Sequence, residues 1–132
     1  MKYLLDTQIL LWARLSPDKL NNSQKVILAS SSDEKFISSV SIWEISLKYS
    51  IGKLNLGEHT PDEFITSLNK LGIKIITPTE QQFATFYLLP ELLKHKDPFD
   101  RMIIWHAIEG GLTLVSRDKK IKGYRIHGLN LI

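Results

Sequence analysis

The chain has 132 residues, 43% of them apolar and 23% charged, which suits one folded domain with a hydrophobic core and excludes a disordered chain. It contains no cysteine, which excludes disulfide scaffolds and thiolate metal sites and leads us to expect a cytoplasmic location. The formal net charge of +3 suits a polyanionic partner, and we expect no membrane association because no segment is long and apolar enough to span a bilayer.

Strand-like and helix-like segments alternate along the chain, which is typical of βα units and predicts a mainly parallel sheet. The expected strands are residues 2–5, 35–38, 73–76 and 112–115, and residues 124–126 and 129–132 are candidates for a short edge strand. The expected helices are residues 9–15, 19–29, 40–49, 61–72, 79–89 and 99–109, the last of these after a loop over residues 94–98. We therefore predict one α/β domain over residues 1–132, with a central sheet of four or five strands flanked by helices.

Several helices carry signals that fix their ends or their buried side. Thr60 and Glu63 are spaced as a capping box at the start of a helix. Ser39 or Ser41 is expected to cap the helix over residues 40–49. For the helix over residues 19–29, the expected packed side consists of Leu20, Val26, Ile27 and the stem of Lys25.

Two acidic residues follow predicted strands. Asp6 comes directly after the strand over residues 2–5, and Asp118 comes three residues after the strand over residues 112–115. The carboxyl ends of parallel strands lie at the same edge of a sheet, which is where α/β proteins place their sites. We therefore expect these two carboxylates, which are far apart in the sequence, to lie close together.

Two further acidic residues lie in helical segments that are apolar on nearly every side. The apolar neighbours of Glu44 are Val40, Ile42, Trp43, Ile45 and Leu47, and those of Asp100 are Phe99, Met102, Ile103, Ile104 and Trp105. Helices of this kind are usually buried, and a buried carboxylate needs a partner or a metal ion. Converging carboxylates repel one another unless a cation neutralises them, and oxygen ligands favour Mg²⁺ or Mn²⁺ over zinc. The sequence therefore predicts a metal site made of Asp6, Glu44, Asp100 and Asp118.

Each of these acids also has a purely structural interpretation. Asp6 suits a helix cap, Asp118 suits a turn, and the segment Asp97–Asp100 suits an ordinary helix start. Glu44 and Lys48 are four residues apart and suit an exposed ion pair that contributes only about 0.3 to 0.5 kcal/mol. The joint placement of four acids at one edge of one sheet favours the metal site over four unrelated structural roles.

Four segments, YLLDTQILLW, SVSIWEISLK, HKDPFDRMIIWHA and LTLVSRD, occur in an order and at a spacing that resemble the PIN-domain family. The resemblance extends from Tyr3 to Asp118, and it is greatest to the VapC-type toxins of bacterial toxin–antitoxin pairs. It implies a PIN-like three-layer fold. The chain departs from many relatives at Gln8, where histidine is frequent, and at Ser116, where threonine is common.

The resemblance also implies a function. It implies a metal-dependent endoribonuclease, the toxin of a toxin–antitoxin pair, which hydrolyses RNA phosphodiesters with a water activated by Mg²⁺ or Mn²⁺. Asp6, Asp100 and Asp118 are expected to hold the ion directly or through waters. Glu44 is expected either to bind the ion or to position the attacking water, and Asp97 is an accessory acid. The implied partners are the RNA substrate, a cognate antitoxin and a second copy in a homodimer.

Other polar residues adjoin the predicted ligands. The hydroxyls of Thr7 and Ser116 suit either a metal-bound water or a helix cap. Arg101 and Arg117 are candidates to steer the RNA backbone, to bind an antitoxin carboxylate or to balance local charge. The basic run Lys119, Lys120, Lys122 and Arg125 is interpreted as a solvated face. His95 and His106 are interpreted as surface or core residues, and Trp12, Trp43 and Trp105 as core or dimer-interface residues.

Three other functions are compatible with parts of the pattern. A structure-specific DNA nuclease uses a similar acid cluster, but nothing in the sequence resembles the helical arch that such enzymes need. A receiver-type signalling domain would want an aspartate at the end of the third strand, and residues 73–77 contain none. A non-catalytic RNA-binding or scaffold domain of the same fold would be favoured by a missing acid, and all four are present.

Overall fold

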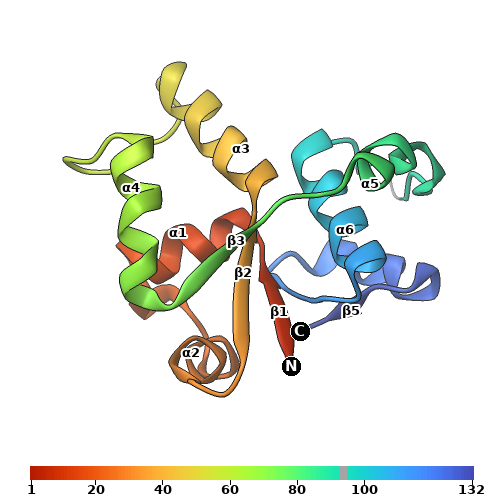
Figure 1. Cartoon of the computed structure of the whole chain (residues 1–132), viewed down its shortest axis with the longest axis horizontal. Coiled ribbons are helices and arrows are strands. Elements are labelled where there is room, and N and C mark those ends of the chain that lie inside the picture. The colour runs from red at the N-terminus through yellow and green to blue at the C-terminus, as the bar shows by residue number, and fades with distance from the viewer. Residues whose placement is uncertain (93–94) are drawn as a thin grey trace.

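The computed structural model describes residues 1–92 and 95–132, which form a five-stranded parallel sheet flanked by helices (Figure 1). The strands are β1 (Lys2–Leu5), β2 (Glu34–Ser38), β3 (Ile73–Ile76), β4 (Thr113–Val115) and β5 (Asn130–Leu131). Their order in the sheet is β3-β2-β1-β4-β5, and each neighbouring pair is parallel. The predicted fold class and the four main strands are thereby confirmed.

The helices lie on both faces of the sheet. The α-helices are α1 (Thr7–Leu15), α2 (Asn22–Ala29), α3 (Ser39–Ser50), α4 (Pro61–Ser67), α5 (Glu80–Ala84) and α6 (Pro98–Gly110). The 3₁₀ helices are η1 (Pro17–Lys19), η2 (Leu68–Leu71), η3 (Phe86–Leu88) and η4 (Lys119–His127). In Figure 1, α1, α2 and α4 lie on one side of the sheet, α5, α6 and the blue C-terminal segment lie on the other, and α3 projects from the top. No helix among the described residues has both the length and the apolar character that crossing a bilayer requires.

Alternation along the central strand β1 builds a separate hydrophobic core on each face. Leu4 packs with residues of α6, β4 and η4, whereas Tyr3 and Leu5 pack with residues of α1, α3 and α4. Leu4 and Leu5 are both fully buried, and each such side chain contributes about 1.5 to 3 kcal/mol when it leaves water. The two cores fix β1, and so they fix the position of Asp6 at its carboxyl end.

The segment predicted as one helix over residues 19–29 is two elements. The 3₁₀ helix η1 ends at Lys19, and Asn21 starts α2 with a capping box, since its side chain accepts a hydrogen bond from the backbone N–H of Gln24 at 2.8 Å. Leu20, Gln24 and Ile27 are buried, whereas Lys25 is exposed and Val26 is 69% exposed. The predicted packing of Leu20 and Ile27 is confirmed, but that of Val26 and Lys25 was wrong, because adjacent helical residues point about 100° apart and the buried face is the one that carries Gln24 and Ile27.

Other boundaries are also corrected. Ser38 caps α3 by accepting a hydrogen bond from the N–H of Val40 at 3.1 Å, so neither Ser39 nor Ser41 is the cap. The helix predicted over residues 79–89 divides into α5 and η3, residues 124–126 belong to η4, and the edge strand is reduced to β5. The capping box of Thr60 and Glu63 is confirmed. The loop predicted over residues 94–98 begins outside the described residues, and α6 starts at Pro98.

Candidate active site

Asp6 and Asp118 are held at the carboxyl edge of the central strands. The N–H of Asp6 donates to the carbonyl of Val115 at 3.0 Å, so that the chain leaving β1 stays beside the end of β4. The Asp6 carboxylate also caps α1 by accepting the N–H of Ile9 at 2.8 Å. Asp118 in turn accepts the N–H of Lys120 at 2.9 Å, at the start of η4. The parallel sheet brings the two carboxylates to one edge, as the sequence predicts.

Two helices supply the other half of the acid cluster. Glu44 lies on α3 and is only 3% exposed. Asp97 caps α6 through hydrogen bonds from the N–H groups of Phe99 (2.9 Å) and Asp100 (3.3 Å), and Asp100 occupies the first turn of the same helix. Carboxylate oxygens of Glu44, Asp97 and Asp100 lie within 4.8 Å of one another.

These five carboxylates line one cleft with a volume of about 610 Å³. The polar and charged residues that line it are Asp6, Thr7, Gln8, Glu44, Lys48, Asp97, Asp100, Arg117, Asp118 and Lys120. All four acids that the sequence singles out, together with the accessory Asp97, are therefore brought together. Asp6, Asp97 and Asp118 are at the same time the N-caps of α1, α6 and η4.

Glu44 has partners for both of its carboxylate oxygens. The Thr7 hydroxyl donates to Oε1 at 2.6 Å and lies 3.0 Å from the Ser41 hydroxyl, and the Lys48 ammonium lies 2.5 Å from Oε2. The sequence allows an exposed ion pair between Glu44 and Lys48, but Glu44 is buried, so the pair differs from an ordinary surface pair. Thr7 is placed against Glu44 and does not cap a helix.

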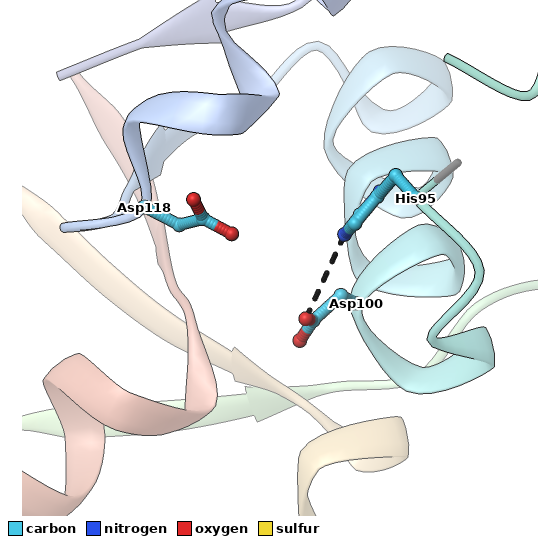
Figure 2. Close-up of side chains that lie close together, drawn as sticks. All are labelled: His95, Asp100 and Asp118. Atoms are coloured by element: carbon cyan, nitrogen blue, oxygen red, sulfur yellow. Dashed lines mark ion pairs between the residues drawn. The ribbon is translucent and has the colours of Figure 1, made fainter. Parts of the chain in front are cut away.

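A histidine joins the cluster from the segment before α6. His95 Nε2 lies 3.7 Å from Asp100 Oδ2, and its Nδ1 is 3.1 Å from the hydroxyl of buried Tyr124. Figure 2 shows the imidazole directed at Asp100, with Asp118 facing both from the opposite side. Ligand atoms of His95, Asp100 and Asp118 lie within 4.8 Å of one another. His95 is thus a site neighbour and not simply a core or surface residue.

The environment of the cluster disfavours ionised carboxyl groups. Burial raises the pKa of Asp6 to about 6. Hydrogen bonds from Ser116 and Ile9 lower this pKa in part, and repulsion from Glu44 and Asp118 raises it. Burial also raises the pKa of Asp100 to about 7, with additional repulsion from Asp97, Glu44 and Asp6. Raised carboxyl pKa values in a cleft are typical of functional sites. A hard divalent cation would relieve this repulsion, so the donor set fits Mg²⁺ or Mn²⁺.

Comparison with known families places this fold and cleft in context. The PIN domain family model matches residues 3–126. The chain belongs to the PIN domain family. Members of this family are typically nucleases, which accords with an acid-lined cleft.

Several solved structures that are similar to this PIN domain are toxin–antitoxin complexes. VapBC2 from Rickettsia felis, bound to a DNA fragment from its promoter, is 26% identical with a TM-score of 0.72, covering 100% of this chain and 98% of that chain. VapBC-1 from nontypeable Haemophilus influenzae is 21% identical with a TM-score of 0.65, covering 100% and 97%. DNA-bound VapBC from Salmonella typhimurium is 20% identical with a TM-score of 0.65, again covering 100% and 97%. The resemblance to VapC-type PIN domains is confirmed. No curated protein matches the chain.

The two arginines predicted to bind substrate differ in their placement. Arg117 lines the cleft of the PIN domain, is exposed, and has its guanidinium 4.9 Å from the centre of the Trp12 ring. Arg101 instead donates to the carbonyl of Leu89 at 2.8 Å and stacks 5.0 Å from the Phe86 ring centre. The structure therefore brings Arg117 to the acids, and it holds Arg101 against η3.

The basic run beyond Asp118 borders a second hollow. Lys122 and Arg125 are exposed, as a solvated face requires, but they also line a hollow of about 410 Å³ together with Trp12 and Lys19. Ser116, Arg117 and Asp118 line it as well, and the last two also line the acidic cleft. The side chain of Lys119 lies outside the described residues. A basic hollow thus continues the acidic cleft on the η4 side.

The remaining aromatic and imidazole side chains fall into three environments. Trp105 is buried, Trp12 is half-buried under Arg117, and Trp43 is 64% exposed with its ring at 5.0 Å from that of Phe99. His106 is buried with Nδ1 3.0 Å from the Ser38 hydroxyl, and burial lowers its pKa to about 4. His106 is a core residue, which is one of the two placements that the sequence left open.

Sequence reasoning missed two members of the site, His95 and Lys48. His95 lies five residues before Asp100, with a helix start between them, so no helical spacing connects the two. Lys48 was recognised only as a partner of Glu44. The signal that could have identified Lys48 is its position one helical turn after Glu44, because side chains four residues apart on a helix are neighbours. A lysine at that spacing lies in the same site as the glutamate.

Proposed function

We propose that this PIN domain is a Mg²⁺- or Mn²⁺-dependent endoribonuclease and the toxin of a toxin–antitoxin pair. The observation that carries the proposal is the convergence of five carboxylates in one cleft, at the edge of the sheet where α/β proteins bind ligands. Purely structural acids would be expected to scatter over the surface.

Asp6, Asp100 and Asp118 would hold the ion, and His95 offers a nitrogen beside the last two. A divalent ion bound there lowers the pKa of a coordinated water and offsets negative charge on the scissile phosphate. Glu44, fixed by Thr7 and Lys48, positions the attacking water from the α3 side of the cleft. Ser116 supports the site by accepting the N–H of Asp118 at 3.1 Å.

The proposed substrate is RNA held in an extended, single-stranded form. Arg117 and Lys120 supply cations at the rim of the acidic cleft, and Lys122 and Arg125 extend them along the adjoining hollow. Lys and Arg side chains of this kind bind phosphates without reading sequence. The assignment to RNA and not DNA rests on the likeness to VapC-type proteins.

The proposed partners are an antitoxin and a second copy of this chain, all in the cytoplasm. The similar structures contain VapBC and FitAB complexes, which supports an antitoxin that covers the cleft. Homodimerisation is supported by an apolar hollow of about 350 Å³ between α3, α5 and α6, lined by Ser39, Val40, Trp43, Phe83, Pro98, Phe99 and Met102. An exposed apolar hollow of this kind marks an interaction surface.

The proposal is tested by incubating the purified chain with a pool of small cellular RNAs in Mg²⁺, in Mn²⁺ and in EDTA. We expect discrete cleavage products that require a divalent ion and that disappear in Asp6→Asn and Asp100→Asn, with both variants still folded by circular dichroism. Matched single-stranded and duplex DNA distinguish an RNase from a DNA nuclease. RNA binding without cleavage under any metal would leave a non-catalytic RNA-binding domain and overturn the enzyme.

A further inference from the structure

The cleft is lined by a positive side chain, Lys48, that contacts one of the buried acids directly. Glu44 and Lys48 are one helical turn apart on α3, and Lys48 Nζ lies 2.5 Å from Glu44 Oε2. The side chain of Lys48 is 40% exposed, whereas that of Glu44 is buried, so the lysine reaches from the solvent side of the cleft to a buried carboxylate. The charges of Asp97 and Asp100 also act favourably on its ammonium. A surface ion pair would lack both the burial and the additional acids.

The acid cluster offers two overlapping places for a cation. One is formed by Glu44, Asp97 and Asp100, and the other by Asp100, Asp118 and His95. Lys48 borders the first place, because its ammonium contacts Glu44 directly and the lysine lines the same cleft as Asp97 and Asp100. Both Glu44 oxygens are therefore engaged, one by Lys48 and the other by Thr7.

We propose that the Lys48 ammonium is a built-in counter-cation that fills the first place, so that the cleft binds a single divalent ion on the side of Asp6, Asp100 and Asp118. On this view Glu44 is the partner of Lys48 and is not a direct metal ligand. Lys48 is a positioning residue, since it acts through Glu44 and through the charge of the cleft. The inference rests on the proposed metal-dependent function and specifies how many ions that site holds.

A charge-based role makes an unusual prediction, which is that removal of Lys48 improves metal binding. Isothermal titration with Mn²⁺ would compare wild type with Lys48→Met, Lys48→Arg and Lys70→Met. Lys70 is exposed on η2 and does not line the cleft, so Lys70→Met matches the change in net charge. We expect Lys48→Met to bind Mn²⁺ on the order of tenfold more tightly, the scale of the repulsion between a unit charge and a divalent ion about 6 Å apart at a dielectric constant of about 80, that of bulk water. Lys48→Arg and Lys70→Met should resemble wild type.

The double variant Glu44→Gln/Lys48→Met separates charge from ligation. It removes both members of the pair and leaves the net charge of the cleft unchanged, so its Mn²⁺ affinity should return to within about threefold of wild type. If Glu44 were a direct ligand, the double variant would instead bind Mn²⁺ much more weakly, which would overturn the inference. The double variant also avoids an unpaired buried carboxylate, so it serves if Lys48→Met alone does not fold.

The outcomes for the inference and for the proposed function are distinguishable. Unchanged or weaker Mn²⁺ binding by folded Lys48→Met, in a protein whose wild type binds Mn²⁺ and cleaves RNA, overturns the role of Lys48 alone. Mn²⁺ binding without RNA cleavage by wild type overturns the nuclease and leaves the role of Lys48 to be decided by the same titrations. If neither wild type nor Lys48→Met binds Mn²⁺, both proposals fail.

Discussion

Asp6, Asp97 and Asp118 each cap a helix and face the same cleft. At the scale of single residues, the structural and the functional interpretation of an acid are therefore not alternatives. In each cap the backbone N–H groups bind Oδ1, so the cap leaves Oδ2 outside its own hydrogen bonds. The short polar cap thus gives each carboxylate a fixed orientation.

The raised pKa of Asp6 predicts that its charge destabilises the metal-free fold. The pKa of Asp6 is about 6 in the folded chain and about 4 in an unfolded one, so stability falls as the pH rises from about 4 to 6 and stays reduced above that. Asp6→Asn keeps the cap but removes the charge. We expect it to raise the free energy of unfolding by about 1 to 2 kcal/mol at pH 7.5 without metal, after allowance for solvent screening.

Urea unfolding in EDTA at pH 7.5 and at pH 4.5 measures this effect. The difference between Asp6→Asn and wild type should shrink to about a third at pH 4.5, where the Asp6 carboxyl of the folded chain is neutral but that of the unfolded chain is still mostly ionised. His106, whose pKa is lowered to about 4, contributes stability that increases with pH in the same range, but it does so equally in both proteins and cancels. A variant less stable than wild type at pH 7.5 would contradict the prediction.

Proton competition at Asp100 should make metal affinity depend on pH. Its pKa is about 7, and a bound cation requires the ionised carboxylate. We expect the Mn²⁺ affinity of wild type to increase between pH 5.5 and pH 7.5 and to level off above pH 8. Calorimetric titrations over this range are the measurement. In Asp100→Asn the affinity should be lower throughout and should rise less steeply, and an equally steep rise would assign the proton to another group.

At the scale of elements, the sequence predicts the strands better than the helix faces. The strands are short apolar runs bounded by polar residues, and β1, β2 and β3 match the predictions within one residue. The orientation of a helix depends on its neighbours. The apolar sequence of α3 predicted burial all round, yet Trp43 is 64% and Leu47 39% exposed, because α3 projects beyond the sheet (Figure 1).

The acid cluster was predictable for the same reason, since strand ends and their edge follow from the alternation of strands and helices. The partners of the acids were not predictable, because their contacts depend on the direction of each side chain. Arg101 follows Asp100 in sequence, but adjacent residues on a helix point about 100° apart, so Arg101 is directed to Leu89 and Phe86. His95 reaches Asp100 only through the path of the segment before α6.

The opposite placements of Arg117 and Arg101 give a paired prediction. Arg117→Met should weaken binding of a short single-stranded RNA several-fold, with little loss of stability. Arg101→Met should lower the free energy of unfolding by about 1 to 2 kcal/mol through the lost hydrogen bond and the cation–π contact, with RNA affinity unchanged. Fluorescence anisotropy in an Asp6→Asn background and urea unfolding are the measurements. Equal effects of the two variants on RNA affinity would contradict this assignment.

At the scale of the whole molecule, the apolar hollow between α3, α5 and α6 predicts self-association. Trp43 lines this hollow and Ile126 does not, although Ile126 is 85% exposed. We expect Trp43→Glu to convert a dimer to a monomer in size-exclusion chromatography with light scattering, because a buried unpaired charge at an interface is costly. Ile126→Glu should remain dimeric, and a dimer in both variants would place the interface elsewhere.

The strand order β3-β2-β1-β4-β5 has a consequence for when the acid cluster can form during synthesis of the chain. The first strand to be synthesised sits in the centre of the sheet, and one of its two neighbours, β4, comes near the end of the chain. Asp6 therefore has no Asp118 beside it until the chain has been synthesised beyond β4. The residues before β4 cannot assemble the acid cluster by themselves, so a nascent chain that has reached only β3 holds one half of the proposed nuclease site.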